Sequence, residues 1–150
     1  MEKYQVVKFV DDEGKKMKYD IKKDKNELID AIKIINTKYN RKDIHLLVAG
    51  DGPLYNKCNQ MNVNNVHLLG KLDFDNVIKM LLQSKIFCLP TRSEGFTTVG
   101  LEASITNNYI ISTPVGGIVE LLINDSYGTI LSKSPTPDEI AEAIILLLIF

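Results

Sequence analysis

The sequence predicts an α/β protein built on a single, doubly wound parallel sheet of about six strands. Short apolar runs, which suit strands buried on both faces, alternate along the chain with amphipathic stretches of helical period. Turns rich in glycine, proline or asparagine follow several of the apolar runs. Strands that alternate with helices in this way form parallel sheets with helices on both faces.

The first half of the chain contains helices and strands with clear apolar periods. Leu28, Ile32, Ile35 and Tyr39 fall on one face of a helix. Pro53 suits the first position of another helix, because the N–H that proline lacks would be unpaired there. The elements predicted up to residue 83 are strand 4–10, helix 25–39, strand 44–49, helix 53–61, strand 66–69 and helix 73–83.

The second half continues the alternation. The run 86–89 is apolar throughout, as expected of a strand that is buried on both faces. The elements predicted after it are a helix from Thr97, a strand at 109–112, a short helix after Gly116-Gly117, a strand at 129–131 and a helix from Asp138.

Residue clusters of the kind that bind metals are not found in the sequence. Asp73-Phe74-Asp75 precedes an apolar helical repeat, so we predict a helix cap followed by a first-turn charge. His45 and His67 lie inside predicted strands, without acidic or cysteine neighbours at ligand spacing. We predict that both histidines are core or edge residues, and that the protein needs neither a metal nor another cofactor.

Composition narrows the class of protein further. The formal charge of −1 gives no global attraction to nucleic acid. Cys58 and Cys88 fall in different predicted elements, which suits a reducing compartment better than a disulfide framework. No signal peptide opens the chain, and the apolar run 143–150 is far shorter than the roughly 20 residues of a spanning helix. We predict a cytoplasmic protein. If the chain is part of a longer enzyme, that enzyme could also bind peripherally to the inner face of the membrane.

One glutamate lies in the turn that follows the apolar run 86–89, and a second lies in the helix after it. Glu94 lies in this turn, and Glu102 lies eight positions later, in the predicted helix. A phosphate at such a strand end would meet free amides at the helix start, while the two carboxylates could accept hydrogen bonds from sugar hydroxyls. Nucleotide sugars carry both phosphates and sugar hydroxyls, so they are the ligands that this combination of groups would bind. The alternative for Glu102 is that it only stabilises the helix through the macrodipole, at roughly 0.3 to 1 kcal/mol.

Two glycine-rich turns follow other predicted strands. Gly50 and Gly52, in the run AGDGPLYN, suit a tight connection from strand to helix as well as a ligand contact. Gly116 and Gly117 open a short helix, where the absence of a Cβ atom permits close approach of the backbone to a diphosphate. Turn geometry explains this second pair equally well, so both alternatives stay open.

The run EGFTTVGLEAS, followed by TPVGGIVELL, resembles the donor-binding half of retaining GT-B glycosyltransferases, the family called glycosyltransferase family 4 or group 1. The family pattern is a Glu, seven residues, a second Glu, and a Gly-Gly turn about fourteen residues later. The resemblance extends over roughly residues 26–143 and is strongest from 86 to 122. It implies a Rossmann-like sheet, which is the C-terminal half of a GT-B fold.

The resemblance implies roles for named residues. Glu94 matches the glutamate that meets the donor sugar and is the expected catalytic residue, and Glu102 matches the one that accepts from the ribose hydroxyls. The resemblance also implies a set of residues that bind the donor. Backbone groups face the sugar and the diphosphate, the Gly-x-Gly-Pro turn faces the cleft, and the segment HLLGKL borders the nucleobase. The members of this set are Gly50, Gly52, Lys71, Leu72, Gly95, Phe96, Thr97, Thr98, Gly116 and Gly117.

The chain departs from the family pattern at its cationic element. The family has a Gly-Arg after its first strand and a Lys-Gly before the first helix, where cations balance the charge that develops on the diphosphate. Here the first strand runs into Asp11-Asp12-Glu13-Gly14, and Lys25-Asn26 is the nearest match, so Lys25 is the expected cation. Asn107 stands where a Gly usually ends a helix, and Asn is the next most tolerant residue of left-handed geometry.

These observations lead to two functional hypotheses. In the first, residues 1–150 form the nucleotide-sugar-binding domain of a longer, metal-independent enzyme that retains anomeric configuration and transfers a sugar to a glycan or lipid-linked acceptor. The acceptor domain is then missing, and the isolated domain is expected to be inactive. In the second, the chain is a nucleotide-sugar-binding or partner-binding module without transfer activity. In either case the apolar residues 144–150 are expected to promote self-association.

Overall fold

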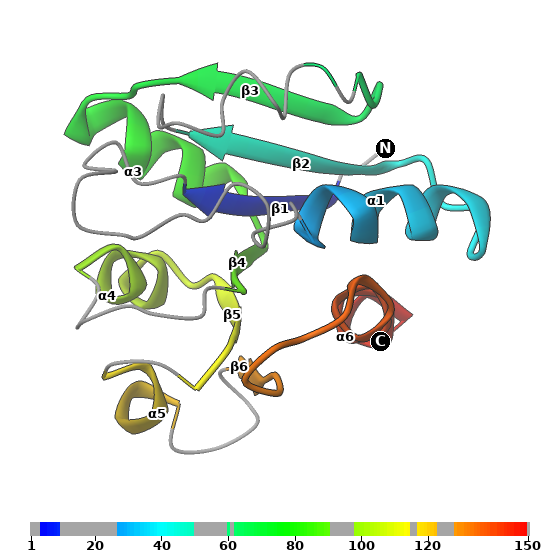
Figure 1. Ribbon diagram of the computed structural model, residues 1–150. Helices are drawn as coiled ribbons and strands as arrows, with labels where there is room; N and C mark the ends of the chain where they lie inside the picture. The colour runs from blue at the N-terminus through cyan, green and yellow to red at the C-terminus, as the bar shows by residue number, and fades with distance from the viewer. Residues whose placement is uncertain are drawn as a thin grey trace.

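The computed structural model describes residues 4–9, 27–49, 60, 62–90, 98–114, 117–122 and 128–149. They contain a six-stranded sheet of order β3-β2-β1-β4-β5-β6 in which every neighbouring pair is parallel (Figure 1). This confirms the predicted doubly wound α/β fold. The strands are β1 (Tyr4–Phe9), β2 (Ile44–Ala49), β3 (Val66–Gly70), β4 (Ile86–Leu89), β5 (Tyr109–Ser112) and β6 (Gly128–Ile130).

Helices cover both faces of the sheet. Figure 1 shows α3, α4 and α5 on one face and α1 and α6 on the other. This arrangement follows from right-handed crossovers, because the chain moves outward from β1 to β3 and then outward in the opposite direction from β4 to β6. The helix bounds are α1 (Glu27–Thr37), α3 (Phe74–Gln83), α4 (Thr98–Ile105), α5 (Ile118–Leu121) and α6 (Pro137–Ile149).

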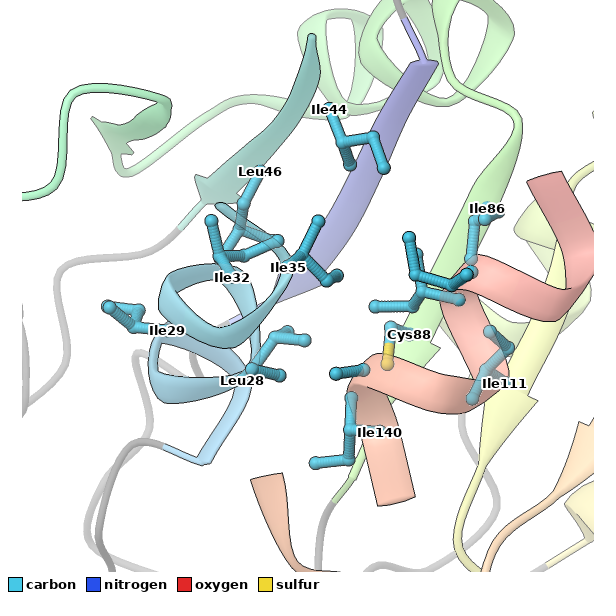
Figure 2. Packing of buried hydrophobic residues seen from close by; sticks show 14 of the residues in the cluster. Leu28, Ile29, Ile32, Ile35, Ile44, Leu46, Ile86, Cys88, Ile111 and Ile140 are labelled. Carbon is cyan, nitrogen blue, oxygen red and sulfur yellow. The ribbon is translucent and has the colours of Figure 1, made fainter. Parts of the chain in front are cut away.

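Successive residues of β4 point into two separate cores. Ile86 and Cys88 pack in the cluster beneath α1 and α6, where Figure 2 shows Cys88 near Ile140. Phe87 lies in the cluster on the opposite face, beneath α3 and α4. All four residues of β4 are buried, which is why the sequence is apolar at every position of this strand. The buried partners beneath α3, α4 and α5 include Met80, Leu81, Ala103, Ile110, Ile118 and Leu122.

Element bounds follow the predictions closely, and several local predictions are confirmed. Asp73 is the N-cap of α3, and its carboxylate accepts a hydrogen bond from the Asn76 backbone N–H at 2.9 Å. Asn107 adopts the left-handed conformation, with φ 62°. The first helix ends at Thr37, two residues before its predicted end, but Tyr39 still packs against the core. Of the predicted helix 53–61, Gln60 is described and is helical, and the other positions lie outside the described residues.

One apolar residue departs from the core pattern. Phe74 begins α3 but is 66% exposed, because Val77, Met80 and Leu81 form the face that turns toward the sheet.

Among the described helices, none has both the length and the apolar character needed to cross a bilayer.

Candidate functional site

The order of the strands reverses direction between β1 and β4. These two strands are neighbours in the sheet, with Val6 opposite Ile86 and Val7 opposite Phe87. The chain leaves β1 toward α1 on one face, whereas it leaves β4 toward α4 on the other. In open α/β sheets, ligands bind outside the carboxyl ends of the strands at such a reversal. The topology therefore identifies this edge of the sheet as the candidate site.

Most residues of the predicted site follow the carboxyl ends of strands in the sequence. Lys25 follows β1, Gly50 and Gly52 follow β2, and residues 91–97 connect the end of β4 to the first residue of α4. The predicted site residues that lie outside the described part of the chain are Lys25, Gly50, Gly52, Glu94, Gly95, Phe96, Thr97 and Gly116.

Glu102 is a described member of the predicted site. It is the fifth residue of α4, which begins at Thr98, and its side chain is half-buried. Its backbone carbonyl accepts hydrogen bonds from the Thr106 N–H at 3.0 Å and the Thr106 hydroxyl at 2.8 Å. Within the described part of the chain, no hydrogen bond or ion pair engages its carboxylate. Glu102 thus offers two acceptor oxygens to which no described residue donates.

The helix macrodipole accounts poorly for Glu102. The favourable field of a helix N-terminus falls off within the first turn. The first turn of α4 holds no acidic residue, and Glu102 lies just beyond it. The position therefore weakens the alternative in which Glu102 serves only to stabilise the helix.

Lys71 and Leu72 follow the end of β3 directly. Gly70 has φ 71°, a left-handed conformation that turns the chain out of the strand, and an added Cβ atom there would meet nothing within 4 Å. The requirement for glycine is therefore one of backbone conformation. Leu72 is half-buried against the cluster beneath α3, and Lys71 is exposed. The turn places both residues between β3 and the N-cap of α3, at the same edge as the end of β4.

Gly117 occupies the N-cap position of α5. Its φ of −83° and ψ of 4° are accessible to other residues, so the backbone does not demand glycine at this position. Turn geometry was one of the two explanations for the Gly116-Gly117 pair, and at Gly117 it does not account for the residue. Close approach of a ligand to the backbone, the other explanation, stays a prediction.

Sequence reasoning missed two buried polar residues at the end of β5. Ser112 and Thr113 are fully buried. The Thr113 N–H donates to the carbonyl of Leu89, the last residue of β4, at 3.2 Å, and the Leu131 N–H donates to the Ser112 carbonyl at 2.7 Å. The Ser112 hydroxyl donates to the Thr113 carbonyl at 2.9 Å. The two backbone bonds join the carboxyl ends of β4, β5 and β6, and segments of the candidate site follow β4 and β5.

Acidic residues near α3 serve a structural role. Asp73 uses its carboxylate as a helix cap, which confirms the prediction for the Asp73-Phe74-Asp75 run. In the part of the chain that the structure describes, no three or more His, Cys, Asp or Glu side chains are arranged to hold a metal ion.

Comparison with known proteins gives matches over most of the chain. The model of the family described as glycosyl transferases group 1 matches residues 16–149. An uncharacterized glycosyltransferase of Methanocaldococcus jannaschii is 34% identical over 122 residues, which cover 79% of this chain and 32% of that protein. The GPI3 subunit of the phosphatidylinositol N-acetylglucosaminyltransferase of Saccharomyces cerevisiae is 32% identical over 106 residues, which cover 67% of this chain and 23% of that protein.

A solved structure shows the same fold. The crystal structure of the Anabaena protein HepE, in complex with UDP and glucose, superposes with a TM-score of 0.74 at 16% identity. The match covers 98% of this chain and 39% of that one. This chain thus spans a quarter to a third of the length of the curated relatives named above.

Proposed function

Because this chain belongs to the group 1 glycosyltransferases, we propose that it forms the donor-binding domain of a retaining, metal-independent enzyme that transfers a sugar from a nucleotide-sugar to a glycan or lipid-linked acceptor. The observation that carries the proposal is the half-buried carboxylate of Glu102, which has no partner in the described chain and lies on the helix that follows the strand reversal. Ribose hydroxyls are the donors that this acceptor would bind.

Each predicted residue has a defined part in this proposal. Glu102 accepts from the ribose, while Glu94 accepts from the donor sugar. The backbone from Gly95 to Thr98 leads into α4, whose positive end lies at the same edge of the sheet and would stabilise a diphosphate there. Gly116 and Gly117 allow the diphosphate to approach the backbone, since neither carries a Cβ atom. Lys71 and Leu72 border the nucleobase, and Gly50 and Gly52 line the neighbouring turn.

The reaction requires charge stabilisation at the leaving diphosphate. As the bond between the sugar and the diphosphate breaks, negative charge grows on the phosphate oxygens, and preorganised N–H groups and cations stabilise it. The amides at the start of α4 and the Lys25 ammonium supply these charges in the proposal. The acceptor hydroxyl attacks from the face that the diphosphate leaves, so the anomeric configuration is retained.

The proposal assigns acceptor binding to a domain outside these 150 residues. The chain covers 32% and 23% of the two relatives, so a complete cleft would need further residues. We therefore propose that these 150 residues bind the donor but do not transfer it when tested alone. We also propose that they act in the cytoplasm, in the assembly of a glycan or glycolipid.

A second candidate function is favoured by one feature of the sequence. The acidic run Asp11-Asp12-Glu13 stands where the family has its cationic element. A binding module that has lost transfer activity would need no cation to stabilise a leaving diphosphate. Replacing Lys25 with Gln separates the two functions in the complete enzyme. Loss of turnover with retained donor binding supports the enzyme, whereas an already inactive parent protein supports the module.

Titration calorimetry tests donor binding directly. The ligands are UDP, UDP-glucose and UDP-N-acetylglucosamine, each measured in EDTA and again with Mg²⁺, because the related proteins carry or are named for these groups. We expect weak saturable binding of at least one ligand in EDTA, since the proposal places acceptor binding outside these 150 residues. Binding that appears only with Mg²⁺ would contradict metal independence, and no saturation at millimolar concentration would contradict the donor site.

A further inference from the structure

A pair of histidines joins the edge strand β3 to β2. His45 Nδ1 and His67 Nε2 are 2.8 Å apart, and the ring centroids are 5.1 Å apart with an angle of 17° between the planes. The centroid separation exceeds the N···N distance by about two ring radii, so both nitrogens lie close to the line that joins the centroids. The rings are therefore nearly coplanar and meet end to end, as required for an N–H···N hydrogen bond.

The strand register explains how the two side chains meet. Leu46 lies opposite Val66 and Leu47 lies opposite His67, so the histidines form a diagonal pair on one face of the sheet. That face also carries Leu47, which packs in the cluster beneath α3. Both rings are half-buried, which limits the water that could replace their mutual hydrogen bond.

An N–H···N hydrogen bond needs one proton between its two nitrogens. A neutral imidazole has one donor nitrogen and one acceptor nitrogen, whereas an imidazolium ion has two donors. The His45–His67 bond survives when the pair is neutral or carries one extra proton on an outer nitrogen. A second extra proton turns both facing nitrogens into donors, so the hydrogen bond is lost. The two imidazolium rings then repel each other.

Side-chain hydrogen bonds contribute to holding the edge strand β3. None of its five residues is fully buried, and Val66 and Leu68 are only partly buried where they pack against the core. Its pairing with β2 shifts register between Val48 and Ala49. Just before the strand, the Asn65 amide donates to the Ile44 carbonyl at 2.7 Å, and the Asn65 and Asn36 side chains exchange hydrogen bonds at 2.8 and 2.9 Å. Loss of the histidine bond would therefore loosen the strand locally before the rest of the sheet.

In the described part of the chain, charged groups lie next to the pair in the segment that leads into β2. Asp43 lies two residues before His45 and interacts electrostatically with it. Both oxygens of Asp43 accept from Arg41, at 2.8 and 2.9 Å. The hydrogen bond from Arg41 lowers the pKa of the Asp43 carboxyl. Asp43 thus stays ionised beside His45 near neutral pH.

We propose that the His45–His67 bond is an acid-sensitive latch that holds edge strand β3 on β2 near neutral pH and releases it on double protonation. The sign follows from proton counting. The released strand binds one more proton than the strand held by the histidine bond. The free energy that favours the paired β3 strand therefore decreases as the pH falls below the ordinary histidine range. A histidine of an unfolded chain has a pKa of about 6.5, so the opening equilibrium of β3 should rise about tenfold by pH 5.5. The latch is independent of what the chain binds.

Nuclear magnetic resonance tests the latch in two ways, with EDTA present throughout to remove stray metal ions. At pH 7.5 we expect a through-bond ¹⁵N–¹⁵N coupling between His45 Nδ1 and His67 Nε2, which disappears at pH 5.5. Hydrogen exchange is then measured for the β3 amides, with the Ile110 and Ile111 amides of β5 as an internal reference. After correction for intrinsic rates, β3 protection should fall about tenfold more than β5 protection between the two pH values.

The variants His67→Gln and His45→Gln complete the test, because each leaves only one titratable ring. Either variant should abolish the excess loss of β3 protection in acid. The inference is overturned if β3 and β5 lose protection equally in the unmodified chain, or if the coupling is absent at pH 7.5. It is also overturned if a folded variant keeps the full acid response. The measurements on the unmodified chain decide the matter even where a variant fails to fold.

Discussion

Replacement of Glu102 by Gln separates a ligand-binding role from a role in stability. Gln preserves the size of the side chain but removes its charge. A hydrogen bond to a charged acceptor contributes about 1 to 3 kcal/mol, so UDP affinity should fall about 5- to 150-fold. Because the fold provides no partner for the carboxylate in the described chain, the free energy of unfolding should change by less than about 0.5 kcal/mol.

The assay pairs calorimetric titration of UDP with urea unfolding of the same preparations. Glu142→Gln is the matched control, since Glu142 is an exposed residue of α6 on the opposite side of the sheet from α4. The control should change neither quantity. If Glu102→Gln instead lowers the free energy of unfolding by more than about 1 kcal/mol and leaves UDP affinity intact, the reasoning about Glu102 is wrong, because the residue then acts through the helix.

Four further predictions follow from the same account. Glu94→Gln should leave UDP affinity unchanged and weaken only the sugar-bearing donor, and equal losses for both ligands by calorimetry would contradict its assigned contact. Phe87→Ala should cost about 3 to 5 kcal/mol in urea unfolding, because the ring is fully buried, whereas Phe74→Ala should cost under about 0.5 kcal/mol, because that ring is 66% exposed. Asp43→Asn should destabilise the chain by under about 1 kcal/mol at pH 7, and the difference should vanish as the pH falls below about 4, since the lowered pKa of Asp43 gives stability that protonation removes; an equal loss at pH 2 would refute this. Light scattering should show concentration-dependent self-association that Leu146→Gln weakens, because Leu146 is 51% exposed on α6, and a strict monomer at high concentration would refute it.

Local patterns in the sequence predicted most of the described fold. The apolar run of β4 follows from burial on both faces, and Asp73 was predicted as a helix cap from its place before an apolar repeat. Asn107 adopts the left-handed conformation that its resemblance to a glycine position suggested. These features depend on residues close together in the chain, which is why a single sequence reveals them.

Features that depend on strand register were missed. The sequence placed His45 and His67 in two strands but gave no means of pairing them, because their contact depends on a diagonal relation between β2 and β3. The buried residues Ser112 and Thr113 escaped notice for a similar reason, since their backbone bonds reach Leu89 in β4 and Leu131 directly after β6. A hint was available in two consecutive hydroxyl residues at the end of an apolar strand.

The predicted site divides into two parts. Thr98, Glu102, Lys71, Leu72 and Gly117 lie in the described chain, next to the ends of strands at one edge of the sheet. The resemblance to a known family supplied their roles, because spacing alone did not distinguish a ligand contact at Glu102 from helix stabilisation. The other site residues lie outside the described chain, and their contacts stay predictions.

A crystal structure of this chain with UDP-glucose is the most direct test of the central claim. The account predicts that the diphosphate lies at the carboxyl ends of β1 and β4, beside the start of α4, with the ribose hydroxyls within hydrogen-bonding distance of the Glu102 carboxylate. A nucleotide bound at the opposite edge of the sheet, or a ribose that makes no contact with Glu102, would contradict it.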